Sequence, residues 1–239
     1  MQDYQLVFHE DFSYEGQPKS SDWTFQVGDK WSNKELQCYT DHIKNCYVKD
    51  GKLTIKATLE EGPCKYQSSR INTKGKREWQ YGKFIIRAKM PKGRGSWPAL
   101  WFLGSNLGKD VGWPACGEID LMEYSGNKPT MIYGSLHSAA YNHKINTERT
   151  TITTLNTPSD QFHDYGVEWT ESFVEFSIDG NPYARYDKVP TDTQKEWPFD
   201  QPFYLIINLA VGGMFGGKVY DEDLPYVLEV DSIKVYQKQ

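Results

Sequence analysis

Three acidic residues in the stretch GEIDLMEY, residues 117–124, have side chains that could perform acid–base chemistry. Glu118 and Asp120 are two residues apart, so on a β-strand their side chains point to one face, roughly 6.6 Å apart. Glu123 lies three residues beyond Asp120, and unbroken alternation would turn it inward, where an unpaired carboxylate is costly. A β-bulge near Leu121–Met122 would shift the alternation by one residue. We therefore expect all three carboxylates on one face.

Three carboxylates on one face repel one another, and stability does not favour that arrangement. A retaining glycosidase uses it, because it needs an ionised nucleophile and a protonated acid about 5–5.5 Å apart. Repulsion raises the pKa of at least one member, so a proton donor remains near working pH and the three groups titrate together. The alternative interpretations are a calcium site and a solvated acidic edge. The first lacks the glycine and carbonyl donors of a calcium loop, and the second does not explain the apolar neighbours.

The elements that must position these acids are predicted to be β-strands almost throughout. Segments 45–58 and 173–186 each alternate around an Asp-Gly pair, which indicates a hairpin. Segments 81–90 and 226–237 alternate as half-buried strands do, whereas segment 202–211 is apolar almost without break and suits a strand covered on both faces. Because helical periodicity is scarce, the pattern predicts an all-β fold of two sheets, a sandwich or jelly roll.

The composition indicates a globular protein without nucleic-acid or membrane partners. The chain has 239 residues, 38% hydrophobic and 25% charged, with a formal net charge of −5, which suits one β-sandwich domain. No Lys/Arg-rich run is present, so a nucleic acid is not an expected partner. No apolar stretch is long enough to span a bilayer. The first residues, MQDYQLVFHE, lack the basic start and apolar centre of a signal peptide.

The four cysteines, Cys38, Cys46, Cys64 and Cys116, do not have the C-x-x-C spacing of a zinc site. Two arrangements therefore stay open. Cys38 and Cys46 could pair in an oxidising compartment, or the thiols could be free and buried.

The stretch GWPACGEIDLMEY resembles the signature of glycoside hydrolase family 16, and more closely that of its bacterial laminarinase-type endo-1,3-β-glucanases. The likeness covers nearly the whole chain and includes NKELQCYT (33–40), SSRINTKGK (68–76), YGKFIIRAKMPKGRGSWPALWFLG (81–104), YGSLHSAAYNHK (133–144) and WPFDQPFYLIINLAVGG (197–213). It implies a β-jelly roll whose concave sheet carries an open glycan-binding cleft. It also implies one catalytic domain over residues 1–239, a monomer, and a secreted, periplasmic or cell-surface location.

The resemblance makes Glu118 the nucleophile, Asp120 its assisting acid and Glu123 the general acid/base of a double displacement with net retention. The implied activity is endo-cleavage of β-1,3-glucan of the laminarin type, with mixed-linkage β-1,3/1,4-glucan as a further substrate. Lichenases and xyloglucan transglycosylases lack the extra residue that Met122 supplies, so those groups are disfavoured. Two alternatives remain: a β-glucan-binding sandwich module without catalysis, and a family hydrolase of another polysaccharide such as agar.

A β-glucan presents apolar faces that match aromatic side chains and hydroxyl edges that match amide or Arg donors. The resemblance implies substrate contacts for eight residues: Asn33, Arg70, Trp97, Trp101, Trp113, His137, Asn208 and Phe215. Trp97 and Trp101 are four residues apart around an apolar turn, so we expect one of them to pack in the core. Family members often carry Trp where Phe215 stands, which weakens the expectation that Phe215 stacks on sugar.

No cofactor is expected for the chemistry itself. The resemblance does imply one structural Ca²⁺, held by the backbone carbonyls of Glu10 and Gly51 and by the carboxylate of Asp231. The alternative interpretation of Asp231 is an ordinary surface acid.

Overall fold

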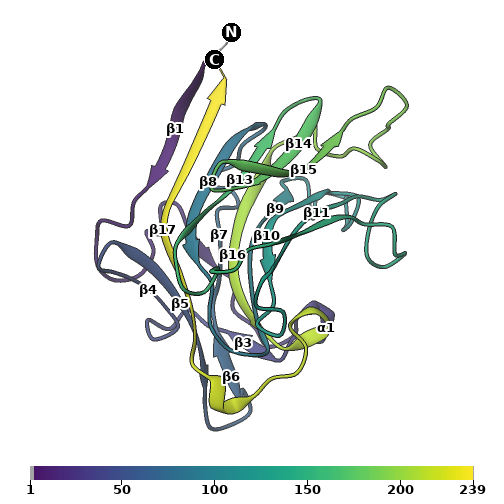
Figure 1. Cartoon of the computed structure of the whole chain (residues 1–239). Helices are drawn as coiled ribbons and strands as arrows, with labels where there is room; N and C mark the ends of the chain where they lie inside the picture. Colours follow the sequence, from purple (N-terminus) through teal and green to yellow (C-terminus); the bar gives the residue numbers. More distant parts are fainter. Residues whose placement is uncertain (1–2, 239) are drawn as a thin grey trace.

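The computed structural model describes residues 3–238, which form two β-sheets packed face to face (Figure 1). In pairing order, the larger sheet contains β15 (Asn181–Asp187), β14 (Phe173–Ile178), β13 (His163–Trp169), β8 (Gly82–Lys89), β17 (Tyr226–Lys238), β5 (Lys52–Leu59), β6 (Tyr66–Ser68) and β3 (Gln37–Tyr39), with β1 (Tyr4–Glu10) beside β17 and β4 (Cys46–Lys49) beside β5. The smaller sheet contains β12 (Arg149–Thr154), β11 (Met131–His137), β10 (Glu118–Tyr124), β9 (Ser96–Gly104), β16 (Phe203–Val211), β7 (Arg70–Asn72) and β2 (Thr24–Phe25). The predicted two-sheet sandwich is confirmed.

Helices are short and lie in the connections. They are η1 (Ser32–Lys34), α1 (Gly213–Gly216) and η2 (Asp221–Asp223). None of the helices within residues 3–238 is both long and apolar enough to cross a membrane.

The two hairpins expected at Asp-Gly pairs are confirmed. Asp50 and Gly51 join β4 to β5 with φ angles of 52° and 71°, and Asp179 and Gly180 join β14 to β15 with φ angles of 51° and 76°. Left-handed backbone at both turn residues is the geometry that matches the twist of the flanking strands, and Asp followed by Gly tolerates it best.

The core lies between the two sheets and decides which face of the smaller sheet is left for function. On β9, Leu100 and Phe102 point into the main hydrophobic cluster, where Phe84 of the larger sheet packs edge-on against Phe102. Because side chains alternate along a strand, Trp97 and Trp101 point to the opposite, outer face. All nine residues of β16 are buried, as its unbroken apolar sequence predicted.

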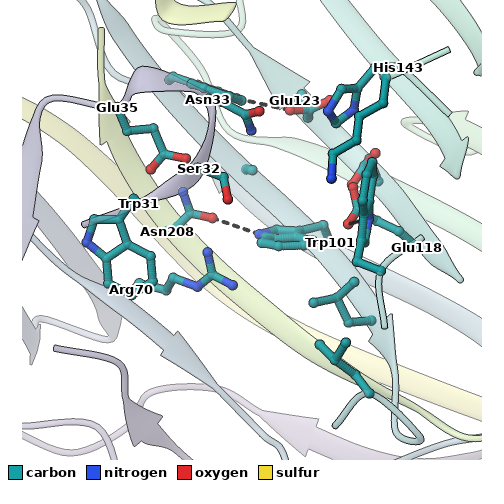
Figure 2. Close-up of a pocket in the computed structure, with 17 residues that line it drawn as sticks. Trp31, Ser32, Asn33, Glu35, Arg70, Trp101, Glu118, Glu123, His143 and Asn208 are labelled. Atoms are coloured by element: carbon teal, nitrogen blue, oxygen red, sulfur yellow. Dashed lines mark hydrogen bonds between the residues drawn. The ribbon is translucent and has the colours of Figure 1, made fainter. Parts of the chain in front are cut away.

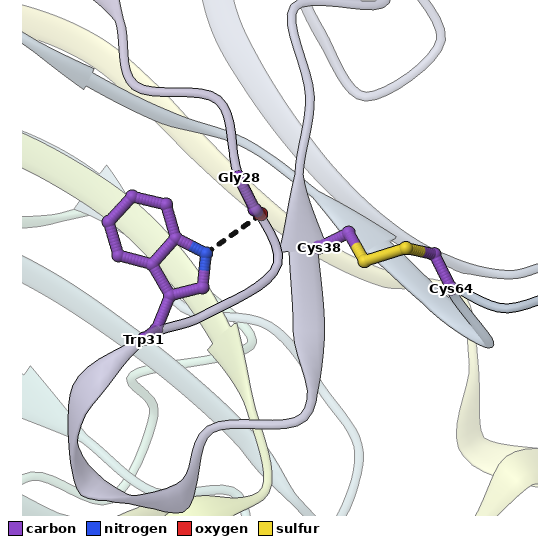
Figure 3. Close-up of a disulfide and its surroundings, with 4 residues drawn as sticks. All are labelled: Gly28, Trp31, Cys38 and Cys64. Carbon is purple, nitrogen blue, oxygen red and sulfur yellow. Dashed lines mark hydrogen bonds between the residues drawn. A yellow bond between two sulfur atoms is a disulfide. The ribbon is translucent and has the colours of Figure 1, made fainter.

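A disulfide joins Cys38 on β3 to Cys64 in the turn between β5 and β6 (Figure 3). Neither of the two arrangements left open holds for Cys38, which pairs with Cys64 rather than with Cys46 and is not a free thiol. Cys46 faces the core from β4 and is fully buried, and Cys116 is also a free buried thiol. The Cα atoms of Cys38 and Cys64 are 5.8 Å apart, within the range that a disulfide can bridge. The cross-link ties the turn between β5 and β6 to β3, whose Gln37 and Tyr39 support the cleft described below.

Reduction of this disulfide is expected to lower the free energy of unfolding by about 3 kcal/mol, because it cross-links residues 26 apart and restricts the unfolded chain. Urea unfolding of the wild type with and without reductant would measure the change. The Cys38→Ser/Cys64→Ser variant is the matched control and should not respond to reductant. Identical unfolding midpoints for the oxidised protein and this variant would contradict the prediction.

Candidate active site

Strand β10 is irregular at the place that the acid spacing predicted. Glu118 pairs with His137 and Glu123 pairs with Tyr133 on β11, so five steps along β10 match four steps along β11. The shift lies between Asp120 and Glu123, and a matching shift occurs against β9. The side chains of the two intervening residues, 121 and 122, are both buried in the core. The predicted bulge is confirmed, and it returns Glu123 to the face that carries the other two acids.

These acids open into a cleft of about 360 Å³ on the outer face of the smaller sheet (Figure 2). Strands β7, β9, β10 and β16 form its floor, and loops around residues 31–35, 107, 113 and 143–144 form its walls. The lining residues are Trp31, Ser32, Asn33, Glu35, Arg70, Trp97, Ala99, Trp101, Leu103, Leu107, Trp113, Glu118, Asp120, Glu123, His143, Lys144 and Asn208.

Each outer carboxylate of the triplet accepts a hydrogen bond from an indole N–H. Trp113 Nε1 donates to Glu118 Oε2 at 2.9 Å, and Trp97 Nε1 donates to Glu123 Oε1 at 3.0 Å. An indole is a donor only, so each contact orients one carboxylate oxygen and leaves the other for chemistry. The structure thus places Trp97 and Trp113 as holders of the acids as well as aromatic walls of the cleft.

The middle acid lies against a histidine. Asp120 Oδ2 is 3.2 Å from His137 Nε2, which is also 3.8 Å from Glu118 Oε1. Asp120 and His137 are both buried. Within residues 3–238, Glu118, Asp120 and His137 are the one group whose carboxylate and imidazole atoms all lie within 4.8 Å of one another and could hold an ion. The same geometry allows His137 to fix the orientation of Asp120 between the two outer acids.

Burial and mutual repulsion shift the acids toward their protonated forms. Burial raises the pKa of Glu118 well above its usual range, and the neighbouring Asp120 adds to the shift. Burial also raises the pKa of Asp120 strongly, with a further contribution from the charge of Glu123. Burial raises the pKa of Glu123, while the hydrogen bond from Trp97 opposes that rise. The site therefore retains a proton at a pH where exposed carboxylates are ionised.

A second set of predicted residues forms a hydrogen-bonded floor. Trp101 Nε1 donates to Asn208 Oδ1 at 2.7 Å, and Asn208 Nδ2 donates to the hydroxyl of Tyr39 at 2.9 Å. The guanidinium of Arg70 lies between two indoles, 4.7 Å from the ring centre of Trp101 and 5.2 Å from that of Trp31. Cation–π contacts of this kind restrict the guanidinium, so the floor is rigid before any ligand binds.

Two predicted contact residues do not line the cleft. The ring of Phe215 packs 5.2 Å from the ring of Trp97 and 4.9 Å from that of Tyr133. Phe215 is half-buried and packs beside these two rings. His137 lies beneath the acids, as described above.

Trp97 is 8% exposed and Trp101 is partly exposed, so Trp97 is the more buried member of the pair.

Sequence reasoning missed eight lining residues: three apolar ones, Ala99, Leu103 and Leu107, and five aromatic, polar or charged ones, Trp31, Ser32, Glu35, His143 and Lys144. Of these last five, three lie close together in the sequence. These three flank Asn33 in the segment WSNKE, and that proximity is a signal that could have found them. The His143 ring lies 4.8 Å from the Trp113 ring, and Lys144 Nζ lies 4.7 Å from its centre. Their positions depend on how the loop after β11 folds back, for which the sequence offers no local pattern.

The sequence profile described as glycosyl hydrolases family 16 matches residues 23–223. The chain belongs to glycosyl hydrolase family 16. Among its relatives, a β-glucanase of Rhodothermus marinus is 41% identical over 245 residues, which cover 98% of this chain and 85% of that protein. The crystal structure of the laminarinase from Rhodothermus marinus superposes with a TM-score of 0.95 at 40% identity, covering 99% of this chain and 98% of that one.

A further family 16 structure shows an occupied active site. It is a mutant of SCLam, a non-specific endo-β-1,3(4)-glucanase, with 1,3-β-D-cellobiosyl-glucose at its active site; it superposes with a TM-score of 0.95 at 39% identity, covering 100% of this chain and 96% of that one. The predicted family and its jelly-roll fold are confirmed. The chain is a glycoside hydrolase.

Replacing Glu118 with Gln is expected to stabilise the protein at pH 8 by about 1–2 kcal/mol, because the change removes a carboxylate that folding buries beside another. The pKa of Glu118 is higher in the folded than in the unfolded chain, so its contribution to stability is fully present below the unfolded value of about 4.3. That contribution is lost as the pH rises through the folded value. The advantage of Glu118→Gln should therefore shrink as the pH falls to 4.

Urea unfolding at pH 4 and pH 8 would test this expectation. Glu61→Gln makes the same chemical change at an exposed position and serves as the control. An advantage of Glu118→Gln that is equal at both pH values, or absent at pH 8, would contradict it.

Proposed function

We propose that this chain is a retaining endo-glycosidase that cleaves internal linkages of β-1,3-glucan of the laminarin type. The observation that carries the proposal is the bulge in β10, which brings Glu118, Asp120 and Glu123 to one cleft. An indole N–H fixes one oxygen of each outer acid. Full-length similarity to a laminarinase and to an endo-β-1,3(4)-glucanase supports the same conclusion.

In the first step, the Glu118 carboxylate attacks the anomeric carbon while the Glu123 carboxylic acid protonates the glycosidic oxygen. The bond between that carbon and the leaving oxygen breaks, and Glu118 becomes an ester. In the second step, Glu123 accepts a proton from water, and the resulting attack on the same carbon releases Glu118. Two inversions at one carbon give net retention.

The change of role at Glu123 follows from charge. Before reaction, burial disfavours ionisation of Glu123, so it holds the proton that the leaving group needs. Esterification of Glu118 removes one negative charge from the buried cluster. Ionisation of Glu123 is then easier, and it becomes the base of the second step. Asp120 lies against His137 and positions Glu118, and its negative charge raises the pKa of Glu118.

The side chains that line the cleft favour a neutral polymer as the substrate. Its aromatic walls, Trp97, Trp101 and Trp113, offer flat apolar surface, and Asn33, Arg70 and Asn208 offer polar groups for hydroxyls. Mixed-linkage β-1,3/1,4-glucan, which shares these faces and edges, is the second substrate of the proposal.

Incubation of the wild type with laminarin is expected to release new reducing ends, with internal cleavage visible as a rapid fall in polymer length. Glu118→Gln and Glu123→Gln should each lower turnover by about 10²–10⁴-fold while the fold survives. Circular dichroism of the variants is the structural control. A wild type that binds laminarin but releases no reducing ends at any pH from 4 to 9 would reject the enzyme in favour of a glucan-binding module.

Azide distinguishes the two roles, because the smaller variants Glu118→Ala and Glu123→Ala leave space for it. A β-azide product is expected from Glu123→Ala, since azide then attacks the glycosyl ester in place of activated water. An α-azide product is expected from Glu118→Ala, since azide replaces the nucleophile. The reverse pattern would overturn the assignments.

We also propose that a structural Ca²⁺ binds on the other side of the sandwich, to the carbonyls of Glu10 and Gly51 and the carboxylate of Asp231. Asp231 lies where the pairing of β17 with β8 shifts register, and Glu10 pairs with Ile233, two residues further along β17. The turn that holds Gly51 leads into β5, which also pairs with β17. Oxygen donors of this kind suit calcium. The guanidinium of Arg87, 3.8 Å from the Asp231 carboxylate, is the competing partner.

Calcium at a hundredfold excess over its dissociation constant should stabilise the protein by about 2.7 kcal/mol, and a chelator should reverse the effect. Thermal unfolding with added Ca²⁺ measures it, with Asp231→Asn as the variant that should not respond. Equal responses of wild type and Asp231→Asn would reject this site.

The same proposal includes a single catalytic domain over residues 1–239 that acts as a monomer outside the cytoplasm. The Cys38–Cys64 disulfide supports an oxidising compartment. A large polymer substrate is also more accessible from a secreted, periplasmic or cell-surface enzyme.

A further inference from the structure

Glu35 enters the cleft from the wall opposite the catalytic acids. It follows the η1 turn, in which Asn33 and Lys34 both have left-handed φ angles, 61° and 58°. The next residue, Leu36, donates its N–H to Val211 O at 3.0 Å, which ties this segment to the end of β16. Figure 2 shows the Glu35 side chain across the cleft from Glu118.

The two oxygens of the Glu35 carboxylate have different surroundings. Oε2 accepts hydrogen bonds from Gln37 Nε2 at 2.7 Å and from the Tyr39 hydroxyl at 3.4 Å. Within residues 3–238, these are the hydrogen bonds that the carboxylate accepts, and no Lys, Arg or His nitrogen lies within 4 Å of it. Oε1 therefore has no protein donor among the described residues.

The Glu35 carboxylate is open to a ligand through Oε1. Burial raises the pKa of Glu35, and hydrogen bonds from Gln37 and Tyr39 together with the charge of Arg70 act in the opposite direction. Oε1 is not among the buried polar atoms that lack a partner in the described part of the chain, so it is accessible from the cleft that Glu35 lines. A ligand hydroxyl can donate to it, because an ionised carboxylate accepts hydrogen bonds and does not donate them.

The orientation of Glu35 is fixed by the same network that fixes the cleft floor. Tyr39 contacts Glu35 at one end and accepts a hydrogen bond from Asn208, which in turn accepts one from Trp101. At the other end, Gln37 Oε1 accepts the N–H of Val211 at 2.7 Å. A sugar stacked on Trp101 and a hydroxyl bound at Glu35 would thus meet one preorganised surface.

We propose that Glu35 is a substrate-binding residue whose Oε1 accepts a hydrogen bond from a hydroxyl of a neutral glucosyl unit. That unit lies in the part of the cleft lined by residues 31–35 and Arg70, and the assignment of the sugar rests on the proposed function. Hydrogen bonds from a hydroxyl to an ionised carboxylate are short and strong, so this contact contributes affinity as well as orientation.

The ionised Glu35 also acts on the catalytic acid through its charge. Its negative charge raises the pKa of Glu123, after the larger effects of burial, Trp97 and His137. Removing that charge makes ionisation of Glu123 easier, so the general acid is lost at a lower pH. The basic limb of the pH profile therefore reports on Glu35 independently of binding.

Glu35→Gln is the sharpest variant, because the amide oxygen can still accept the hydrogen bonds of Gln37 and Tyr39 while an NH₂ group replaces the free oxygen. We expect kcat/KM on laminarin to fall by about tenfold to a hundredfold, mainly through a higher KM. The basic limb of the kcat/KM profile should move to lower pH. Glu61→Gln, at an exposed position, is the control and should match the wild type in both respects.

Binding can be measured without turnover by comparing Glu118→Gln with Glu118→Gln/Glu35→Gln, using a laminarin hexasaccharide and calorimetry. The second protein should bind about tenfold to a hundredfold more weakly, and its circular dichroism spectrum should be unchanged. Equal affinity of the two proteins would overturn the role of Glu35, as would a Glu35→Gln enzyme with wild-type KM and pH profile. A wild type that releases no reducing ends would instead reject the proposed function and leave the calorimetric comparison to decide on Glu35.

Discussion

An extra residue in β10 is the feature on which the rest of the active site depends. A strand that runs through the middle of a sandwich must keep apolar side chains on its core face, and Ile119, Leu121 and Met122 all lie there. The same strand must present carboxylates to the outer face, because a buried charge without a partner is not tolerated. Only a break in alternation satisfies both demands for Glu123. The bulge disrupts the strand pairing locally, and it is what allows three acids to share one surface.

Once the acids share a face, their neighbours decide what each can do. Burial raises the pKa values of the outer acids. The hydrogen bonds from the two indole N–H groups act in the opposite direction, because they favour the ionised carboxylates. Trp97 and Trp113 therefore each combine an aromatic ring that lines the cleft with a fixed donor for a carboxylate. The ring of Phe215 packs against Trp97, which adds to the contacts that hold this indole.

The opposite wall of the cleft is built by segments that are far apart in the sequence. The η1 turn, the β3 strand and the end of β16 meet there, and the Cys38–Cys64 disulfide holds β3 to the turn between β5 and β6. The chain of hydrogen bonds from Trp101 through Asn208 and Tyr39 to Glu35 crosses this junction. A hydrogen-bonded floor of this kind has little freedom to lose when a polymer binds, which is the physical basis of preorganisation.

The amino-acid sequence by itself determined several of the strands, the two Asp-Gly hairpins and the bulge, because each depends on alternation or turn chemistry within about ten residues. It also pointed to the acids and most of the residues that line the cleft, through a resemblance that spans the chain. Only the tertiary structure decided that Cys38 pairs with Cys64, that Phe215 packs against Trp97, and that Glu35, His143 and Lys144 reach the cleft. These are contacts between distant segments, and their geometry is set by how sheets and loops pack, which no local pattern of residue types encodes.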